Sequence, residues 1–221
     1  MIDDLGIVIA AAGNSSRFGE DDKLLWELDG LPLFLHAPRN FYSVCPEDNM
    51  LIVVHPDRIV QFENIARRYL PGMNLRFVAG AEVRAGSVLN GLKALPDCVK
   101  FVAVHDAARP WATEKLLKDC LDSARMHGGS VPAKPVVDTL KLADVDGKIV
   151  DTVSRSSLWR VETPQVFELE KLLAANQHCL EMDVEFTDDA SIMEAAGYDV
   201  YIVESEKNNK KITYRKDLSE E

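Results

Sequence analysis

The residues best suited to chemistry lie near the N-terminus, in residues 7–23, which read IVIAAAGNSSRFGEDDK. A short apolar run ends there in Ala-Ala-Gly, and a loop of small and polar residues follows. A turn of this kind exposes backbone N–H groups, and its small residues let a polyphosphate approach them closely. Arg17 and Lys23 place two cations on the same loop, where they can neutralise the charge that develops when a phosphoryl group is attacked. The stretch therefore indicates an enzyme that handles nucleotides and acts on phosphates.

Two other phosphate-binding motifs fit this loop less well. A dinucleotide-binding fingerprint requires G-x-G-x-x-G and an acidic residue at the end of the second strand. Here Ser15 stands where the second glycine belongs, and the second apolar run ends in His55-Pro56. A P-loop fails as well, because no Gly-Lys-Ser/Thr follows. The simpler alternative is an ordinary strand-to-helix turn whose cations lie on the surface.

A second candidate group lies in VHDAARP, residues 104–110. Asp106 follows an apolar run of strand length, and a lone carboxylate at the carboxyl end of a parallel strand can hold Mg²⁺ against substrate phosphates. The alternatives for Asp106 are capping of the next turn or an ion pair with Arg109. We expect His105 to be a packed or supporting residue rather than a ligand.

A glycine-bearing loop, GAEVRAGSVLNGL at residues 80–92, is the third candidate. Its backbone groups, the Glu82 carboxylate and the Ser87 hydroxyl could together recognise the edge of a nucleobase. The alternative reading makes Ser87 the N-cap of a helix that starts there, with the charged residues in solvent.

Residues that could bind a second phosphate are spread over the second half of the chain. Each is weak evidence alone, since Thr187 resembles a helix N-cap and Lys210-Lys211 resembles a solvated pair. Together they supply the cations and hydroxyls that a phosphorylated acceptor substrate would need. The group comprises Asp138, Thr139, Leu140, Lys141, Arg155, Thr163, Thr187, Asp188, Asp189, Asn209, Lys210 and Lys211.

Composition restricts the class of protein and its partners. The chain has 221 residues, 47% of them hydrophobic, which suits one α/β domain. Its formal net charge of −11 disfavours nucleic acids and anionic membranes, which bind to broad basic surfaces. The four cysteines are scattered, so we expect free buried thiols in a reducing compartment. We see no signal peptide and no apolar run of the ~18 residues that span a bilayer, and we expect a cytoplasmic protein.

The elements that must position these residues alternate between strand and helix. Strands separated by helices predict a mainly parallel, Rossmann-like sheet with helices on both faces, in three layers. Ligands of such sheets bind at the carboxyl ends of the strands, where the first three candidate loops begin. The expected strands are residues 7–12, 50–55, 75–78 and 101–105, and the expected helices are residues 32–44, 59–70, 87–95 and 113–127.

The pattern changes after residue 135. Residues 139–145 and 148–153 alternate apolar and polar side chains around Asp146-Gly147, which is a strong hairpin signal. Such a hairpin is either an edge decoration or an arm that pairs with another subunit, and we favour the protruding arm. No composition break marks a second domain. The rest of the chain predicts helices over residues 168–180 and 188–196 and a strand over residues 199–203.

The order of these motifs resembles that of the 2-C-methyl-D-erythritol 4-phosphate cytidylyltransferases of the non-mevalonate isoprenoid pathway. The match runs nearly end to end. It implies one cytidylyltransferase domain over residues 1–221, with residues 136–160 as a β-arm for dimerisation. It also implies that an acceptor phosphate oxygen attacks the α-phosphorus of CTP, with Mg²⁺ bridging and pyrophosphate leaving. The motifs are AAG with the following Arg and Lys, RAGSVLNGL, VHDAARP, PVVDTLK, TVSRSSLW, TPQVF, TDDAS and NNKKIT.

The resemblance further implies a role for each matching residue. Arg17 and Lys23 would stabilise the five-coordinate transition state, and Arg155 and Lys211 would hold the acceptor phosphate for attack. Asp106 would bind both the metal and CTP. In a homodimer, Thr139 and Arg155 would reach the acceptor pocket of the partner chain. The remaining residues would be Ala11, Ala12, Gly13, Asn14, Ala81, Glu82 and Ser87 for CTP, and Thr139, Lys141 and Thr163 for the acceptor.

The chain departs from the usual family pattern at several positions. The family commonly has Pro-Lys-Gln at the end of the first loop, whereas this chain has Asp22-Lys23-Leu24, with Asp21 adding a second negative charge. Ser15 and Ala81 stand where glycine is usual. Glu162 replaces a residue that is commonly neutral, and Lys210 one that is usually apolar.

Three alternative functions compete with the one that this resemblance implies. Cytidylyltransferases for another alditol phosphate, such as ribitol 5-phosphate, more often open with Ala-Gly-Gly, whereas this chain opens with Ala-Ala-Gly. A non-catalytic nucleotide-binding protein on the same fold would be expected to lose Arg17, Lys23 or Asp106, and all are present. An NAD-dependent oxidoreductase is disfavoured by the incomplete fingerprint.

Overall fold

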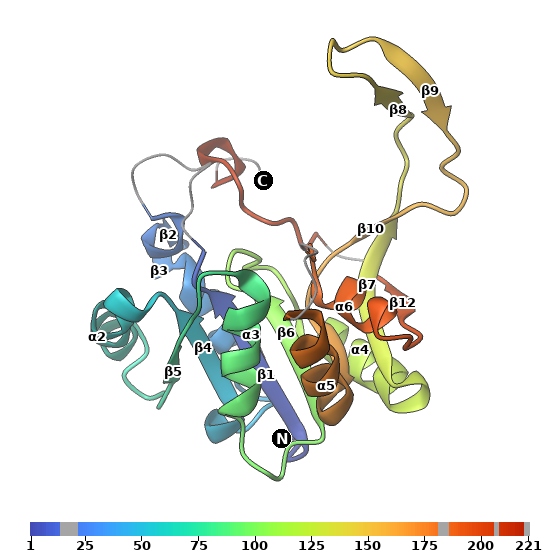
Figure 1. Cartoon of the computed structure of the whole chain (residues 1–221). Coiled ribbons are helices and arrows are strands. Elements are labelled where there is room, and N and C mark those ends of the chain that lie inside the picture. Colours follow the sequence, from blue (N-terminus) through green and yellow to red (C-terminus); the bar gives the residue numbers. More distant parts are fainter. Residues whose placement is uncertain (14–21, 181–185, 206–207, 219–221) are drawn as a thin grey trace.

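A computed structural model describes residues 1–13, 22–180, 186–205 and 208–218 of the chain. Within these residues, an eight-stranded sheet has the order β10-β7-β11-β6-β1-β4-β5, with β12 paired to β7 (Figure 1). Strands β1, β4, β5 and β6 run parallel, whereas β10 and β11 run antiparallel to their neighbours. The strands are β1 (Leu5–Ala11), β4 (Met50–Val54), β5 (Arg76–Ala79), β6 (Phe101–Asp106), β7 (Gly129–Pro135), β10 (Trp159–Val161), β11 (Gln165–Glu168) and β12 (Tyr201–Glu204).

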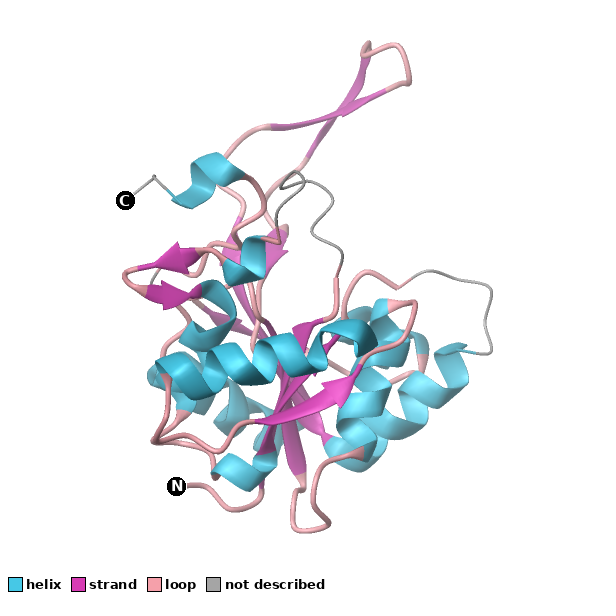
Figure 2. Cartoon of the chain, turned by 90° about the vertical axis from the view of Figure 1, so that its left-hand side faces the viewer, coloured by secondary structure: helices cyan, strands magenta, loops and turns pink. Residues whose placement is uncertain are grey.

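Helices cover both faces of this sheet (Figure 2). Alternate side chains of a strand point to opposite faces, so Ile7 and Ile9 of β1 enter one core and Val8 enters the other. The first core includes buried residues of α1, α2 and α4, and the second includes those of α3, α5 and α6. The predicted three-layer α/β fold is confirmed. The helices are α1 (His36–Phe41), α2 (Ile59–Tyr69), α3 (Arg84–Lys93), α4 (Glu114–His127), α5 (Leu169–Leu180) and α6 (Asp189–Ala195).

Strand register brings the ends of the central strands to one edge of the sheet. Ala10 of β1 lies beside Asp106 of β6, and Ala11 lies beside Val54 of β4. The first, second and third candidate loops therefore leave the sheet at neighbouring positions, as predicted.

The expected helix over residues 32–44 is shorter than predicted. Pro32 belongs to the short strand β3 (Leu31–Pro32), which pairs with β2 (Glu27–Leu28), and its extended backbone prevents a helix from starting there. A 3₁₀ turn over Leu33–Leu35 follows, and α1 then occupies only His36–Phe41. His36 Nε2 lies within hydrogen-bonding distance of the carbonyl oxygens of Leu28 and Leu31, which ties the start of α1 to the β2–β3 turn.

Strands β7, β10 and β11 were not predicted from the sequence. Strand β7 reads GSVPAKP, and its glycine and two prolines are residues that usually interrupt strands. It forms because neighbouring strands pair with it along both sides. Strands β10 and β11 contain only 3 and 4 residues, too few for a periodic pattern to be recognised.

The predicted hairpin is confirmed as a protruding pair of strands, β8 (Leu140–Ala143) and β9 (Ile149–Val153) (Figure 1). Its turn is closed by the Asp144 carboxylate, which accepts the backbone N–H groups of Asp146 and Lys148. Gly147 adopts a φ of +82°, a conformation that favours glycine. All residues of both strands are exposed, and none of them belongs to either of the two cores.

Three of the four cysteines are buried free thiols, as expected, but Cys98 is exposed. Burial raises the pKa of the Cys45 and Cys120 thiols to about 12, so both remain protonated. Among the described helices, none has the length and apolar character needed to cross a membrane.

Candidate active site

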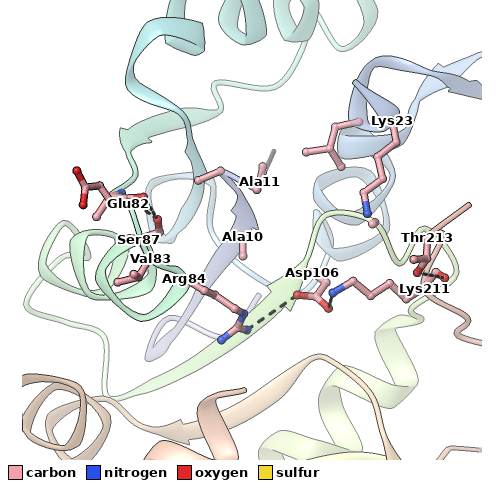
Figure 3. A pocket seen from close by; sticks show the side chains of 15 residues that line it. Ala10, Ala11, Lys23, Glu82, Val83, Arg84, Ser87, Asp106, Lys211 and Thr213 are labelled. Carbon is pink, nitrogen blue, oxygen red and sulfur yellow. Dashed lines mark hydrogen bonds and ion pairs between the residues drawn. The ribbon is translucent and has the colours of Figure 1, made fainter. Parts of the chain in front are cut away.

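A cavity of about 300 Å³ opens at the carboxyl edge of the sheet, between the ends of β1 and β6 and the start of α3 (Figure 3). The segment after β12 and the 3₁₀ turn over Lys23–Leu25 complete its wall. Residues from four separate sequence motifs thus share one cavity. Those that were predicted from the sequence are Ala11, Ala12, Gly13, Lys23, Ala81, Glu82, Ser87, Asp106 and Lys211.

The first wall is the chain that leaves β1 at residues 11–13. The Ala12 side chain of this segment lies directly against Gly80 of the neighbouring loop. A Cβ atom at Gly80 would lie 2.7 Å from the Ala12 Cβ, closer than real Cβ contacts allow, and 3.2 Å from the Val54 carbonyl oxygen. Asn14 and Arg17, which the sequence also assigns to this wall, lie outside the described residues.

The Ser87 hydroxyl shapes the second wall rather than capping a helix. Its Oγ accepts the Ala81 backbone N–H at 2.9 Å and lies 3.1 Å from the Ala81 carbonyl oxygen, to which it donates. Helix α3 begins at Arg84 with Val83 as its N-cap, one turn earlier than predicted. The N-cap interpretation of Ser87 is therefore wrong. Its hydroxyl instead folds back the loop that carries Ala81 and the exposed Glu82.

Asp106 ends β6 at the centre of the cavity, between cations on two sides (Figure 3). Lys211 Nζ donates to its Oδ2 at 2.8 Å, and Arg109 Nε lies 3.6 Å from the same oxygen. Arg84 lies 3.9 Å from Oδ1. Burial of this carboxyl opposes ionisation, yet Lys211 and Arg84 outweigh burial and hold its pKa well below the usual range. Asp106 is thus a permanent anion at neutral pH.

Two buried side chains, those of Thr163 and His105, form a hydrogen-bonded chain that ends at the Asp106 backbone N–H. The Thr163 hydroxyl accepts the Asp106 N–H at 3.0 Å and donates to His105 Nδ1 at 3.0 Å. His105 Nε2 must then donate to the Arg109 carbonyl oxygen, 3.1 Å away, since a carbonyl only accepts. Burial lowers the pKa of His105 to about 4, so the ring is neutral. As predicted, His105 is a packed supporting residue.

Thr163 was predicted to bind the acceptor, but it is buried and does not line the cavity. Its side chain is only 4% exposed, and its hydroxyl already uses both the donor and an acceptor position. Its backbone carbonyl accepts the Asn209 amide at 2.7 Å. Thr163 therefore positions Asp106 and the segment before Lys211.

Replacing Thr163 with valine is expected to lower the free energy of unfolding by about 1–3 kcal/mol, because the buried Asp106 N–H and His105 Nδ1 would lose their partner. Urea unfolding of the purified variant measures the loss. Thr163→Ser keeps the hydroxyl and serves as the control. Equal stability of the valine variant and the wild-type chain would contradict this assignment.

The segment that carries Ile212 connects the two lysines of the cavity, Lys23 and Lys211. Lys23 Nζ donates to the Ile212 carbonyl oxygen at 3.1 Å, while the Ile212 N–H donates to the Ala108 carbonyl oxygen at 2.9 Å. Lys211, the residue before Ile212, binds Asp106. The interpretation of Lys210-Lys211 as a solvated pair is wrong, because Lys210 also binds a carboxylate, that of Asp217, at 3.0 Å.

Arg84 is a pocket cation that the sequence reasoning missed. It lies in the predicted base loop, but its partner is 105 residues away: Asp189 Oδ2 accepts from it at 2.7 Å. Burial raises the pKa of the Asp189 carboxyl, and Arg84 opposes that rise. Asp188, not Thr187, is the N-cap of α6, where its side chain accepts the Ser191 N–H. The adjacent acidic residues of TDDAS were the available signal for this ion pair.

Thr139, Lys141 and Arg155 are not brought to this cavity by their own chain. All are exposed on the protruding arm or its base, and none lines the cavity. Lys141 Nζ donates to Thr152 Oγ1 across the hairpin at 2.6 Å, and Arg155 donates to the Val137 carbonyl oxygen.

Comparisons with known proteins show the family of this chain. A family model described as 2-C-methyl-D-erythritol 4-phosphate cytidylyltransferase matches residues 5–220. The enzyme of that name from Dictyoglomus thermophilum is 35% identical over 219 residues, covering 97% of this chain and 93% of the relative. The one from Clostridium novyi is 33% identical over 213 residues, covering 96% and 92%.

The fold is similar as well. The crystal structure of 2-C-methyl-D-erythritol 4-phosphate cytidylyltransferase from Thermus thermophilus matches with a TM-score of 0.82 and 29% identity, over 99% of this chain and 96% of that chain. Some relatives are longer: the Bifunctional enzyme IspD/IspF of Allorhizobium ampelinum is 37% identical over 224 residues, and the chain spans 54% of its length. The match along almost all of the sequence and fold shows that this chain belongs to the 2-C-methyl-D-erythritol 4-phosphate cytidylyltransferase family of nucleotidyltransferases.

Proposed function

We propose that this chain transfers the cytidylyl group of CTP to 2-C-methyl-D-erythritol 4-phosphate, giving CDP-methylerythritol and pyrophosphate. The observation that carries the proposal is the Asp106 carboxylate at the sheet edge, with Lys211 at 2.8 Å and Lys23 on the adjacent Ile212 carbonyl. A cavity that presents fixed cations and a fixed anion beside a backbone loop suits a triphosphate and its metal. The family of the chain supports the same reaction.

The reaction needs positioning and charge neutralisation more than proton transfer. An oxygen of the acceptor phosphate, already ionised near neutral pH, forms a bond to the α-phosphorus of CTP. The bond from that phosphorus to the oxygen bridging to the β-phosphorus breaks, and its electron pair leaves with pyrophosphate. No proton has to be removed, which agrees with a cavity that uses lysine, arginine and aspartate while the nearby His105 is buried and neutral.

Different walls of the cavity are assigned to different parts of CTP. The loop with Ala81, Glu82 and Ser87 is assigned to the cytosine base, and residues 11–13 are assigned to the triphosphate through their backbone N–H groups. Lys23 supplies positive charge where charge builds up during transfer. Asn14 and Arg17 are assigned to the same triphosphate from the sequence.

Mg²⁺ is the metal proposed for this site, and Asp106 is the residue that would hold it. The described residues contain no cluster of three or more His, Cys, Asp or Glu that could form a complete cage. A lone ionised carboxylate suits Mg²⁺ because this ion is commonly bound by one or two carboxylates together with substrate phosphates and water. When bound, Mg²⁺ supplies positive charge to the phosphate oxygens.

The acceptor phosphate is assigned to Lys211 and to the arm of a second copy of the chain. Thr139, Lys141 and Arg155 are exposed and separate from the cavity of their own chain, so they are available to complete another site. Exposed apolar residues on the same arm, such as Leu142 at 55% and Ile149 at 59%, suit burial in a homodimer. We propose this dimer, and we place it in the cytoplasm, where CTP is made.

The test of this function is a pyrophosphate-release assay with CTP and Mg²⁺. We expect turnover with 2-C-methyl-D-erythritol 4-phosphate and much slower turnover with ribitol 5-phosphate at equal concentration. Product identity is checked by mass spectrometry. Turnover with ribitol 5-phosphate alone, or CTP binding without turnover of either acceptor, would contradict the proposal.

Arg155→Ala is expected to raise KM for the acceptor strongly and to leave KM for CTP nearly unchanged, because Arg155 lies away from the CTP-binding cavity. When this variant is mixed with Lys23→Ala, the activity of the mixture should exceed the summed activities of the two separate variants. In each heterodimer, one site combines the intact cavity of the Arg155→Ala chain with the intact arm of the Lys23→Ala chain. The measurement is turnover of the mixture, with heterodimer content checked by native mass spectrometry. Confirmed heterodimers without restored activity would contradict the shared site.

A further inference from the structure

Asp22, the residue before Lys23, uses its carboxylate in two directions. Its Oδ1 accepts the Leu24 N–H at 3.0 Å, which makes Asp22 the N-cap of the 3₁₀ turn Lys23–Leu25. Its Oδ2 forms an ion pair with the guanidinium of Arg58, the residue just before α2. The two side chains are only 10% and 29% exposed, so solvent screens this pair less than an ordinary surface pair. We name the pair the Asp22–Arg58 clasp.

The clasp is anchored in the hydrophobic core. The Arg58 guanidinium lies over the Phe62 ring, 5.0 Å from its centroid. Phe62 is fully buried, and its ring lies 4.6 Å from that of Phe34. The backbone immediately before Lys23 is therefore connected through side chains to a rigid part of the fold.

Two further contacts fix the turn Lys23–Leu25, one made by Leu24 and one by the Lys23 ammonium. Leu24 is buried in the same core as Phe34 and Phe62. The Lys23 ammonium, at the far end of a flexible side chain, donates to the Ile212 carbonyl oxygen beside Lys211. Lys23 is thus held near its Cα by the clasp and at its tip by the segment that carries Lys211.

From this geometry we propose that Asp22 is a positioning residue, which acts with Arg58 to hold Lys23 in place for phosphoryl transfer. The role in transfer rests on the proposed function. The sequence shows only that Asp22 adds negative charge beside Lys23. The structure shows that the Asp22 carboxylate pairs with Arg58 and caps Leu24, so this residue restrains the backbone next to Lys23.

Four variants separate the parts of this device. Asp22→Asn keeps an oxygen that can cap Leu24 and removes the ion pair, whereas Asp22→Ala removes both. Arg58→Ala removes the pair from the other side. Asp22→Pro lacks both contacts, but its ring fixes φ near the −79° that Asp22 already adopts, so it restrains the backbone by another route. Glu63→Ala is the matched control, since it breaks an exposed ion pair with Arg67 on the same helix.

The expected result is a fall in kcat of about 10-fold for Asp22→Ala, because small displacements of a charge-stabilising group are costly, with KM for the acceptor unchanged. The double variant Asp22→Ala/Arg58→Ala should be no slower than the slower single variant, because the two residues act as one unit. Asp22→Asn should lie between Asp22→Ala and the wild-type chain. Asp22→Pro should recover most of the turnover, and Glu63→Ala should match the wild-type chain.

Hydrogen–deuterium exchange provides a readout that does not depend on the reaction. Exchange of a peptide covering residues 22–26 should rise in Asp22→Ala and Arg58→Ala, which loosen the turn, and not in Glu63→Ala. The wild-type chain could prove inactive while its turn still exchanges slowly and Asp22→Ala accelerates that exchange. This result would contradict the proposed function and support the clasp. Three results would each overturn the clasp. The first is a folded Asp22→Ala whose exchange and turnover are unchanged. The others are a double variant whose losses of kcat are additive, and a folded Asp22→Pro that turns over as slowly as Asp22→Ala.

Discussion

Lys23→Ala is expected to lower kcat by roughly 10²-fold or more, as loss of a preorganised charge donor at a transition state typically does. Lys23 lines the cavity, and its ammonium is held at the Ile212 carbonyl oxygen. Lys211 cannot replace it, because that ammonium binds Asp106 at 2.8 Å. The measurement is steady-state pyrophosphate release with saturating CTP and acceptor.

The control for this experiment is Lys171→Ala. Lys171 is a partly exposed lysine of α5 that pairs with Glu168 at 2.6 Å and does not line the cavity. Its loss removes one positive charge from the chain without affecting the site, so turnover should be unchanged. Near wild-type turnover by a folded Lys23→Ala would refute the role assigned to Lys23.

Asp106→Asn is expected to reduce kcat/KM for CTP by roughly 10²-fold or more, since it removes the preorganised anion at the centre of the cavity. The amide keeps the size of the side chain but leaves Lys211, Arg109 and Arg84 without their shared carboxylate. Calorimetric titration with CTP at several Mg²⁺ concentrations should show that binding loses most of its Mg²⁺ dependence.

The pH dependence of this variant offers a second check. Because the folded-state pKa of Asp106 is depressed, its carboxylate is ionised throughout the neutral range. The ratio of wild-type to variant turnover should therefore stay constant from about pH 6 to about pH 9. The control is Asp119→Asn, at a partly exposed aspartate of α4 that does not line the cavity. Unaltered Mg²⁺ dependence in a folded Asp106→Asn would show that this carboxylate does not hold the metal.

The sequence predicted the first half of the fold better than the second. Up to residue 127, strands and helices alternate, and the central strands are buried on both faces, so hydrophobic runs such as that of β1 identify them directly. Strands β7, β10 and β11 depend on pairing with partners distant in the sequence, and Pro132 in β7 obscures the pattern. Local signals therefore could not identify these three strands.

The candidate site shows the same contrast between residues found by local motifs and contacts made over long sequence distances. Lys23, Asp106 and Lys211 were predicted because each belongs to a motif whose residue types indicate phosphate chemistry, and the structure brings them together. Arg84 was missed because its partner Asp189 is distant in the sequence. The burial of Thr163 beside the end of β6 cannot be read from the TPQVF motif. Pairings over long sequence distances are fixed by topology, which the local pattern does not encode.

The contact at Gly80 limits how this protein can diverge. A side chain at this position would collide with Ala12, so the loop after β5 and the chain that leaves β1, which we propose bind the base and the triphosphate, keep their close contact with glycine at residue 80. A mutation that added a side chain there would push the two loops apart and would impair nucleotide binding as a whole. Under the proposed function, a change of base preference that keeps this contact would involve the exposed residues Ala81 or Glu82 rather than Gly80.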